Sequence, residues 1–331
     1  MSIEQGTTMV DDFARDTERF RRELLAHCYR MMGSVQDAED VVQETYLRAW
    51  RGYQRFEGRS SIRTWLYRIA TNACLNALRG AGRRALPSGL GDPSDDPLSP
   101  PEPAAADVRW VQPIPDALVT PDSDDPAAIA TSRESLRLAL VASLQHLPPS
   151  QRAVLILRDV LAWSADEVAE ALGTSTVAVK SSLQRARARM AQLRPAPDQI
   201  EEPSEAHGRA LLEAYLAAFE NSDPAALTAI LRADASLELP GSRTWFSGNT
   251  TCIPFLAAQA LGEPGDWRML PIAANGQPAL AAYRRDDSGA HRAFGVAVLT
   301  VTGTGISRVV AYGDAGLLDL FGLPSVHPAD R

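Results

Sequence analysis

Aromatic and polar side chains of the kind that contact nucleic acid gather between residues 53 and 79. The loop from Tyr53 to Ser61 places aromatic rings beside arginines. Arginine binds phosphate through a fork of donors, and aromatic rings stack on unpaired bases. The helix expected after this loop leaves outside a basic and amide face, made of Arg63, Arg68, Asn72, Asn76 and Arg79. These residue types favour contact with phosphates and base edges.

A second basic surface is expected between Leu172 and Pro197, where five basic residues occur without an acidic one. Ser164-Ala-Asp-Glu167 is a capping box that opens a helix at Ala165–Leu172, and Gly173 fits the left-handed position that ends it. A three-residue turn leads to a helix over Thr176–Leu193. Two short helices of this kind, the second one basic, form a helix-turn-helix pattern.

The second of these helices divides into an inner and an outer face. Val179, Leu183 and Ala186 share the apolar face, so the polar residues near the N-terminal half point outward. Lys and Arg suit guanine O6 and N7, and Gln suits adenine. We therefore expect base contacts from Lys180, Ser181, Gln184 and Arg185, and phosphate contacts from Arg187 and Arg189.

An acidic helix precedes both basic segments. Ala38, Val41, Val42, Thr45 and Ala49 recur at helical spacing and predict a buried face. The opposite face carries Asp37, Glu39, Asp40, Gln43 and Glu44, and suits a basic groove on another protein. A solvated surface is the simpler interpretation for each charged face taken alone.

Other helices are needed to position these surfaces. A first helix is expected over residues 13–32, and Ile62, Trp65, Leu66, Ile69 and Ala73 mark the buried face of the helix after the loop. Before the helix-turn-helix, a helix from about Ser132 ends at Pro148-Pro149, and Ser150 is expected to cap the next one.

Composition sets limits on the function. The chain has 331 residues, of which 45% are hydrophobic and 22% charged, so two or three globular domains are expected. Because no apolar run reaches membrane-span length and the N-terminus lacks a signal-peptide pattern, we expect a cytoplasmic protein without a membrane partner. Cys28, Cys74 and Cys252 have no metal-ligand spacing, and we expect no cofactor or metal.

The middle of the chain differs from its flanks. Residues 81–130 are rich in Pro, Gly, Ser and Asp, which predicts an extended acidic linker. Trp110–Asp116 combines an aromatic residue with prolines, and this suggests a stretch that docks on something. The net charge of −8 averages over this linker and the basic helices, so it does not exclude nucleic acid.

The C-terminal part predicts an α+β domain. Helices are expected at 205–220 and after Asp223-Pro224, and another near 250–261. Strands are expected at 235–239, 267–273, 279–285, 292–301 and 306–312, with hairpin turns at Asn275-Gly276 and Asp286–Gly289. Helices followed by a curved antiparallel sheet suggest a cone.

Two motifs carry a resemblance to a known family. DAEDVVQETYLRAW followed by F-x-G-R-S-S-I-R-T-W-L-Y-R-I-A-x-N resembles region 2 of the extracytoplasmic-function (ECF) sigma factors of bacterial RNA polymerase. LPPSQRAVLILRDVLAWSADEVAEALGTSTVAVKSSLQRARARM resembles their region 4. The resemblance implies a multi-domain chain: all-α region 2 at 10–80, a linker at 81–130, all-α region 4 at 131–195, and the α+β domain at 204–331.

The resemblance also assigns roles to residues. It implies docking on the clamp helices of the polymerase largest subunit through Asp37, Asp40, Gln43, Glu44, Leu47, Arg48 and Trp50. Capture of the melted −10 strand falls to Phe56, Arg59, Ser60, Ser61, Arg63, Tyr67, Arg68, Asn72 and Asn76, while Trp65 is expected in the core. The −35 element falls to Thr176, Lys180, Ser181, Gln184, Arg185, Arg187 and Arg189.

The family pattern implies further partners and one departure. Core RNA polymerase, including the flap of the second-largest subunit, and promoter DNA are the implied partners, and an anti-sigma factor is another candidate. The family often carries arginine where Lys180 and Ser182 stand, so the base preference does not transfer. No ATP-binding loop is present, and strand opening would be driven by binding energy.

The C-terminal segment resembles the SnoaL-like branch of the NTF2-like superfamily, whose cones enclose pockets. Residues expected to line such a pocket are Glu238, Trp245, Asn275, Tyr283, His291 and Asp314. No catalytic pattern of that superfamily can be matched, so we favour a regulatory domain that contacts the sigma regions or the linker. The alternatives are a helix-turn-helix regulator that acts without polymerase, and a small-molecule isomerase or hydrolase with helical appendages.

Overall fold

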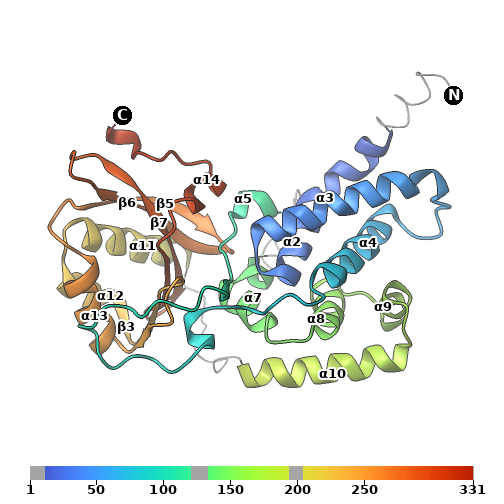
Figure 1. Ribbon diagram of the computed structural model, residues 1–331, viewed down its shortest axis with the longest axis horizontal. Coiled ribbons are helices and arrows are strands. Elements are labelled where there is room, and N and C mark those ends of the chain that lie inside the picture. The colour runs from blue at the N-terminus through green and yellow to red at the C-terminus, as the bar shows by residue number, and fades with distance from the viewer. Residues whose placement is uncertain (1–11, 121–132, 194–203, 331) are drawn as a thin grey trace. The chain divides into compact units, whose positions relative to one another are not determined.

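The computed structural model describes residues 12–120, 133–193 and 204–330 (Figure 1). The chain forms two compact units. Unit 1 combines residues 1–84 with 116–194, and unit 2 combines residues 85–115 with 195–331. Among the described residues, no helix has both the length and the apolar content needed to cross a bilayer.

Unit 1 is helical. Its first half consists of a helical turn at residues 12–17, then η1 (Glu18–Phe20), α2 (Arg21–Met32), α3 (Val35–Gly52), η2 (Tyr53–Arg55), α4 (Ile62–Ala77) and α5 (Asp116–Val119). Its second half consists of α7 (Leu138–Leu144), α8 (Pro149–Leu155), η4 (Ile156–Val160), α9 (Ala165–Leu172) and α10 (Thr176–Leu193).

Local sequence signals explain most of these boundaries. The Ser34 and Ser61 side chains cap α3 and α4 by accepting hydrogen bonds from backbone amides. The capping box at Ser164 and Glu167 opens α9, and Gly173 ends it with φ of 62°, which confirms both predictions. The exact span predicted for the last helix of the helix-turn-helix is also that of α10.

Two predictions in the second half are wrong. The helix expected from Ser132 is interrupted at Arg137, which has extended backbone, and α7 begins after it. Arg30 donates to the Ser135 carbonyl at 3.4 Å, and this carbonyl is one that a continuous helix would use. The next helix begins at Pro149 with Pro148 as its cap, rather than at Ser150, because proline at the first helical position has a suitable φ and needs no donor.

Two buried arginines join the halves of unit 1. Arg30 on α2 donates to the Ser135 hydroxyl at 2.7 Å. Arg152 on α8 donates to the Met31 carbonyl and to the Gln145 side chain, the latter at 2.6 Å. Burial lowers the pKa of each guanidinium to about 10. Both therefore remain charged at neutral pH, held by neutral oxygen atoms.

Unit 2 is an α+β domain in which helices cover a curved sheet (Figure 1). Its strands are β3 (Leu231–Glu238), β4 (Trp245–Ser247), β5 (Trp267–Ala274), β6 (Gln277–Arg285), β7 (His291–Thr302) and β8 (Gly305–Tyr312). The helices are α11 (Glu205–Glu220), α12 (Pro224–Ile230), α13 (Asn249–Phe255), η6 (Leu256–Ala260), α14 (Leu317–Leu320) and η7 (Pro328–Asp330).

The sheet has the order β4-β3-β8-β7-β6-β5. Neighbours pair antiparallel except β3 and β8, which are parallel. The expectation of a wholly antiparallel sheet is therefore wrong at this pair. A long connection separates β3 from β8 in sequence, so no hairpin forces them antiparallel. The strand β4 was not predicted, because three residues are too few to show an alternating pattern.

The linker segment, residues 85–115, lies on unit 2 instead of extending freely. It contains η3 (Pro87–Gly89) and, near its C-terminal end, β2 (Arg109–Trp110). The strand β2 forms a two-stranded sheet with β1 (Arg84–Ala85). Val111 and Ile114 are fully buried, and Asn275 exchanges hydrogen bonds with Ile114. The docking stretch predicted around Trp110 thus has a partner within the same unit.

Candidate nucleic-acid interface

One face of α4 carries the polar residues predicted to contact single-stranded DNA. Arg68, Asn72 and Asn76 are exposed at intervals of four residues and so share one stripe of the helix. The opposite face contains Leu66, Ala70 and Cys74, which are fully buried. The burial pattern of the helix therefore fixes which side chains are available to a nucleic acid.

The loop before α4 presents further exposed groups. Arg59, Ser60 and Ser61 are exposed, and Arg59 forms an ion pair with Glu57 at 2.6 Å. Phe56 is half-buried and packs on the Trp65 ring, with centroids 4.9 Å apart. The loop thus offers one aromatic ring with a partly open face, supported from behind by a second ring.

Two predicted contact residues have partners inside unit 1. The Arg63 guanidinium pairs with Glu23 at 2.7 Å and lies over the Tyr67 ring at 5.0 Å. Tyr67 is buried, and its hydroxyl donates to the Glu23 carboxylate at 3.1 Å. Burial raises the pKa of Tyr67. In this arrangement Tyr67 supports Arg63 and offers no surface of its own.

On α2, the buried His27 forms a hydrogen bond with Thr71 of α4. The Thr71 hydroxyl donates to the Tyr67 carbonyl at 2.7 Å and so accepts from His27 Nε2 at 2.9 Å. His27 Nδ1 is buried and has no hydrogen-bond partner among the described residues. Burial, and secondarily Arg30, lowers the pKa of His27 to about 3. The imidazole is therefore neutral at physiological pH.

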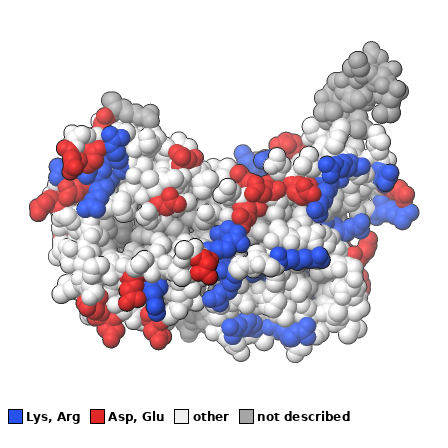
Figure 2. Space-filling model, viewed as in Figure 1, with Lys and Arg blue, Asp and Glu red and all other residues white. Residues whose placement is uncertain are grey.

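The outer face of α10 carries the second group of predicted contacts. Lys180, Gln184 and Arg185 are exposed, while Val179, Leu183 and Ala186 are buried against the rest of the unit. Figure 2 shows basic side chains gathered over this helix. Arg185 bonds to the Ser181 hydroxyl at 2.5 Å within the same face. This face has the polar composition of a helix that enters a major groove.

Other α10 residues are anchored on α9 and on η4 before it. Thr176 donates to Asp166 at 2.7 Å, and Arg187 pairs with Asp159 at 2.6 Å. Arg189 is exposed and bonds to Gln192 at 3.2 Å. The sequence did not single out Val177, which is 76% exposed at the start of α10. Helical periodicity identifies apolar residues that are buried, so it gives no sign of an apolar residue that is exposed.

The acidic helix α3 presents the third predicted surface. Asp40, Gln43, Leu47 and Arg48 are exposed, and Trp50 is half-buried. Glu44 pairs with Arg48 at 2.6 Å, whereas Asp37 turns to Arg84 at 2.6 Å. Figure 2 shows acidic side chains gathered over α3. All seven predicted docking residues thus remain at the surface or partly at it, and Asp37 among them is engaged by Arg84.

The two nucleic-acid faces are not equally free, because α9 lies against α4. Asn72 Nδ2 donates to the Ala171 carbonyl at 3.2 Å, and Arg68 pairs with Glu170 at 3.4 Å. Tyr67 packs edge-on against Trp163 of the segment before α9. The start of the α4 stripe is therefore in contact with the helix-turn-helix.

Comparison with known proteins identifies these elements. A family model described as "Sigma-70 region 2" matches residues 17–84, and one described as "Sigma-70, region 4" matches residues 137–190. The chain is 51% identical to the ECF RNA polymerase sigma factor SigG of Mycobacterium tuberculosis over 315 residues, which are 95% of this chain and 84% of that protein. The chain belongs to the ECF sigma factor family.

Two further comparisons agree with the family and the fold. The sigma factor SigJ of Mycobacterium tuberculosis is 34% identical over 172 residues, which are 51% of this chain and 47% of SigJ. The crystal structure of SigJ covers 96% of this chain and 99% of its own, with a TM-score of 0.58 and 23% identity. The two family models confirm the predicted order of region 2 before region 4, and the SigJ structure shares the fold of helical regions followed by an α+β domain.

Family membership settles the general activity. The chain acts with core RNA polymerase and promoter DNA to direct promoter-specific transcription initiation, as a transcription initiation factor. The rival interpretation of a regulator that acts without polymerase left region 2 unexplained, and the region 2 match overturns it.

Three of the six residues expected to line a pocket in unit 2 contact the linker segment. Glu238 is fully buried, accepts from the Ser88 amide at 2.9 Å and pairs with Arg308. Trp245 Nε1 donates to the Gly91 carbonyl at 2.8 Å. Asn275 Oδ1 accepts from the Ile114 amide at 3.0 Å. These side chains bind the chain's own backbone.

The other three residues lie elsewhere. The Tyr283 hydroxyl donates to the Pro324 carbonyl at 3.1 Å. His291 contacts Asp330 at 2.7 Å and the Gly265 carbonyl at 2.9 Å. Asp314 is exposed and accepts from the Gly316 amide. Among the described residues, no group of His, Cys, Asp and Glu is arranged to hold a metal ion.

Proposed function

We propose that the exposed stripe of α4 captures the melted −10 strand, with Arg68, Asn72 and Asn76 as its direct contacts. The observation that carries this proposal is their common exposed face above a wholly buried one. Amide groups can pair with the edges of unstacked bases, and the arginine attracts phosphate. Phe56 supplies a stacking ring, and Arg59, Ser60 and Ser61 supply donors beside it.

The remaining −10 residues act indirectly in this proposal. Arg63 keeps its pairing with Glu23, and Tyr67 holds that pair in place from below. Both residues then set the position of the strand-binding loop without touching the bases.

Recognition of the −35 element is assigned to α10. Lys180, Ser181, Gln184 and Arg185 face the major groove, while Arg189 binds phosphate. Thr176 and Arg187 are held by Asp166 and Asp159, so they orient the helix within its motif. The docking face for the polymerase clamp helices is the exposed side of α3, with Asp40, Gln43, Glu44, Leu47, Arg48 and Trp50.

The proposal also includes domain boundaries, a cellular location and further partners. Residues 10–80 and 131–195 act as the two sigma regions, joined by residues 81–130, and residues 204–331 form the fused domain. We place the chain in the cytoplasm, where polymerase and promoter are found. Contact with the flap of the second-largest subunit, and with an anti-sigma factor, are part of this proposal.

The fused domain is proposed to modulate initiation by holding the linker segment. Three buried side chains hold it in place. Glu238, Asn275 and Tyr312 each form a hydrogen bond with the backbone of that segment. A buried hydrogen bond lost on one side leaves its partner unsatisfied, at a cost of about 1–3 kcal/mol. Single substitutions should therefore loosen the segment measurably.

A matched pair of tyrosines tests this modulation. Tyr312 donates to the Val111 carbonyl at 2.9 Å, whereas Tyr283 donates to Pro324, outside the segment. We expect Tyr312→Phe to change promoter-dependent transcription by core polymerase severalfold and Tyr283→Phe to leave it unchanged. Equal transcription by both variants would remove the modulation proposal.

A residual small-molecule activity of residues 204–331 is the second candidate. The contacts of Glu238, Trp245 and Asn275 with the linker segment do not favour it, since these polar groups are already satisfied. Turnover of a small molecule by the full chain, lost in Glu238→Gln, would support the activity.

A further inference from the structure

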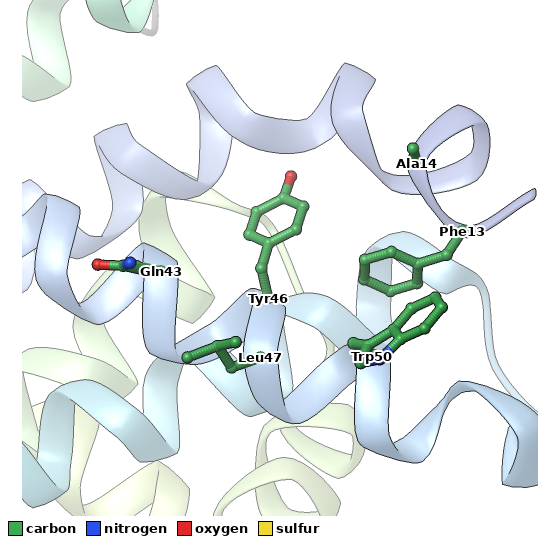
Figure 3. A pocket seen from close by; sticks show the side chains of 6 residues that line it. All are labelled: Phe13, Ala14, Gln43, Tyr46, Leu47 and Trp50. Atoms are coloured by element: carbon green, nitrogen blue, oxygen red, sulfur yellow. The ribbon is translucent and has the colours of Figure 1, made fainter. Parts of the chain in front are cut away.

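Two large apolar side chains are exposed among the described residues of unit 1, Leu47 and Val177. Leu47 lines a hollow together with Phe13 and Trp50 (Figure 3), on the α3 face already assigned to polymerase docking. Val177 stands at the start of α10 and is 76% exposed. Docking explains the exposure of Leu47, whereas nothing in the proposed function explains that of Val177.

The helix itself does not favour a valine at this place. A β-branched residue is a weaker helix former than alanine, lysine or glutamine, and a side chain this exposed buries little apolar surface in the free chain. Other groups hold the first turn of α10: the Ser175 hydroxyl accepts from the Ala178 amide at 3.2 Å, and Thr176 donates to Asp166 at 2.7 Å. Val177 thus adds little to the stability of region 4, yet it stands on a turn that is fixed in position.

Val177 shares the outer face of α10 with three residues assigned to base contacts. Lys180, Ser181 and Gln184 follow it at intervals of three, four and seven residues, which places all four side chains on one stripe. The buried residues of the helix lie on the opposite face. From Val177 to Gln184 the stripe is about 10 Å long, at a rise of 1.5 Å per residue, which equals about three base-pair steps of 3.4 Å. The two ends of the stripe can therefore meet different base pairs.

The chemistry of the major groove indicates what an apolar side chain on this stripe can read. Base edges there present hydrogen-bond donors and acceptors, and the one apolar group among them is the C5-methyl of thymine. Valine has no side-chain donor or acceptor, so against any other base edge it would leave polar atoms without a partner. The N-terminal residues of a recognition helix are the ones that reach base edges, and Val177 is among them.

We infer that Val177 packs on the C5-methyl group of one thymine in the −35 element and thereby selects a T·A pair at that position. This inference rests on the proposed role of α10 in −35 recognition. It adds an apolar contact to the polar contacts of Lys180 and Gln184, and it places the selected thymine at one end of the contacted bases.

Removing one methyl group at a time tests this contact. The full chain selects its −35 duplex from a random pool, and each thymine of that duplex is then replaced by deoxyuridine, which keeps every hydrogen-bonding group. We expect the wild type to lose about fourfold in affinity at one thymine, as expected for one buried methyl group, with no measurable loss at the others. Val177→Ala should bind the thymine and deoxyuridine duplexes equally, because its shorter side chain does not reach the methyl group.

Two variants serve as controls. Val177→Thr keeps the branched shape and one of the two methyl groups, so it should retain part of the preference for thymine. Arg189→Ala removes a proposed phosphate contact, so it should weaken binding to the thymine and deoxyuridine duplexes by the same factor.

The outcomes separate this inference from the role of α10. Equal binding of thymine and deoxyuridine duplexes by the wild type at every position would overturn the Val177 contact, and so would a preference that Val177→Ala retains in full. In both cases, weaker −35 binding by Lys180→Ala would keep the recognition role of α10. Unchanged −35 binding by Lys180→Ala, Arg185→Ala and Val177→Ala would overturn both.

Discussion

The two helices assigned to promoter recognition differ in what holds their polar faces. On α10, the contacts of Thr176 and Arg187 stay within region 4, with Asp166 of α9 and Asp159 of η4. On α4, Asn72 and Arg68 reach across to Ala171 and Glu170 of the other sigma region. The proposed −35 contact face of α10 is thus exposed, whereas the proposed −10 contact face of α4 is partly covered by α9. The comparison implies that duplex recognition can precede strand capture.

The buried contact between His27 and Thr71 of α4 gives the largest expected effect, which is a dependence of stability on pH. His27 has its pKa lowered from 6.5 to about 3, so the unfolded chain binds the proton more readily. Stability from this group is fully present above pH 6.5 and is lost as the pH falls toward 3. The slope is about 1.4 kcal/mol per pH unit between these values. Denaturant unfolding at pH 7 and pH 5 measures it.

A neutral replacement provides the control for that slope. His27→Gln has no proton to gain, so its stability should depend less on pH over the same interval, whatever its absolute stability. Identical slopes for the wild type and His27→Gln would show that His27 does not titrate as a buried neutral group. The buried residues of α10 are apolar, so that helix has no buried titratable group of this kind.

Substitutions on the two helices should separate strand capture from duplex binding. Asn72→Ala/Asn76→Ala is expected to reduce open-complex formation about 100-fold, because two base-pairing amides are lost while duplex binding by region 4 persists. Lys180→Ala or Arg185→Ala should instead weaken binding to −35 duplex by about 1–3 kcal/mol. Permanganate reactivity at −10 and duplex titration measure the two effects. Equal loss in both assays for all variants would erase the distinction.

The contact of α9 with α4 gives the smallest expected effect. The Arg68–Glu170 pair spans 3.4 Å with side chains 47% and 79% exposed, and such pairs contribute less than about 1 kcal/mol. We expect Glu170→Gln to speed open-complex formation by about twofold at low salt and by less at high salt. Slower opening would show that Glu170 helps strand capture instead of opposing it.

Patterns local to one element predicted most of the fold. The capping box at Ser164, the glycine at 173 and the Asp223-Pro224 start each depend on a few neighbouring residues, and all are present in the structure. The Asn275-Gly276 hairpin has the positive φ angles expected of its turn. Helix periodicity likewise identified the exposed face of α10 and the exposed Arg68, Asn72 and Asn76 of α4. The buried face predicted for α4 is wrong in part, because Ile62, Trp65 and Ile69 are only half-buried.

Contacts between distant segments could not be predicted in the same way. The composition of residues 81–130 predicts an extended linker in which Trp110–Asp116 docks, but it does not identify unit 2 as the surface on which Val111 and Ile114 are buried. Their partners stand more than 150 residues later in the sequence. Similarly, nothing local to Tyr67 shows that its ring is covered, and nothing local to Phe13 shows that its ring packs edge-on against Trp50.

The most direct test is a distance between the two sigma regions. Arg51 and Ala188 are exposed and lie outside the proposed contacts, and the three native cysteines are buried, so Arg51→Cys/Ala188→Cys can carry a spin-label pair. Elements centred about 25 base pairs apart lie about 85 Å apart along duplex DNA, at 3.4 Å per base pair. We predict one short distance in the free chain and one longer by tens of ångströms in a transcribing promoter complex. An unchanged distance in a complex that transcribes would contradict the account.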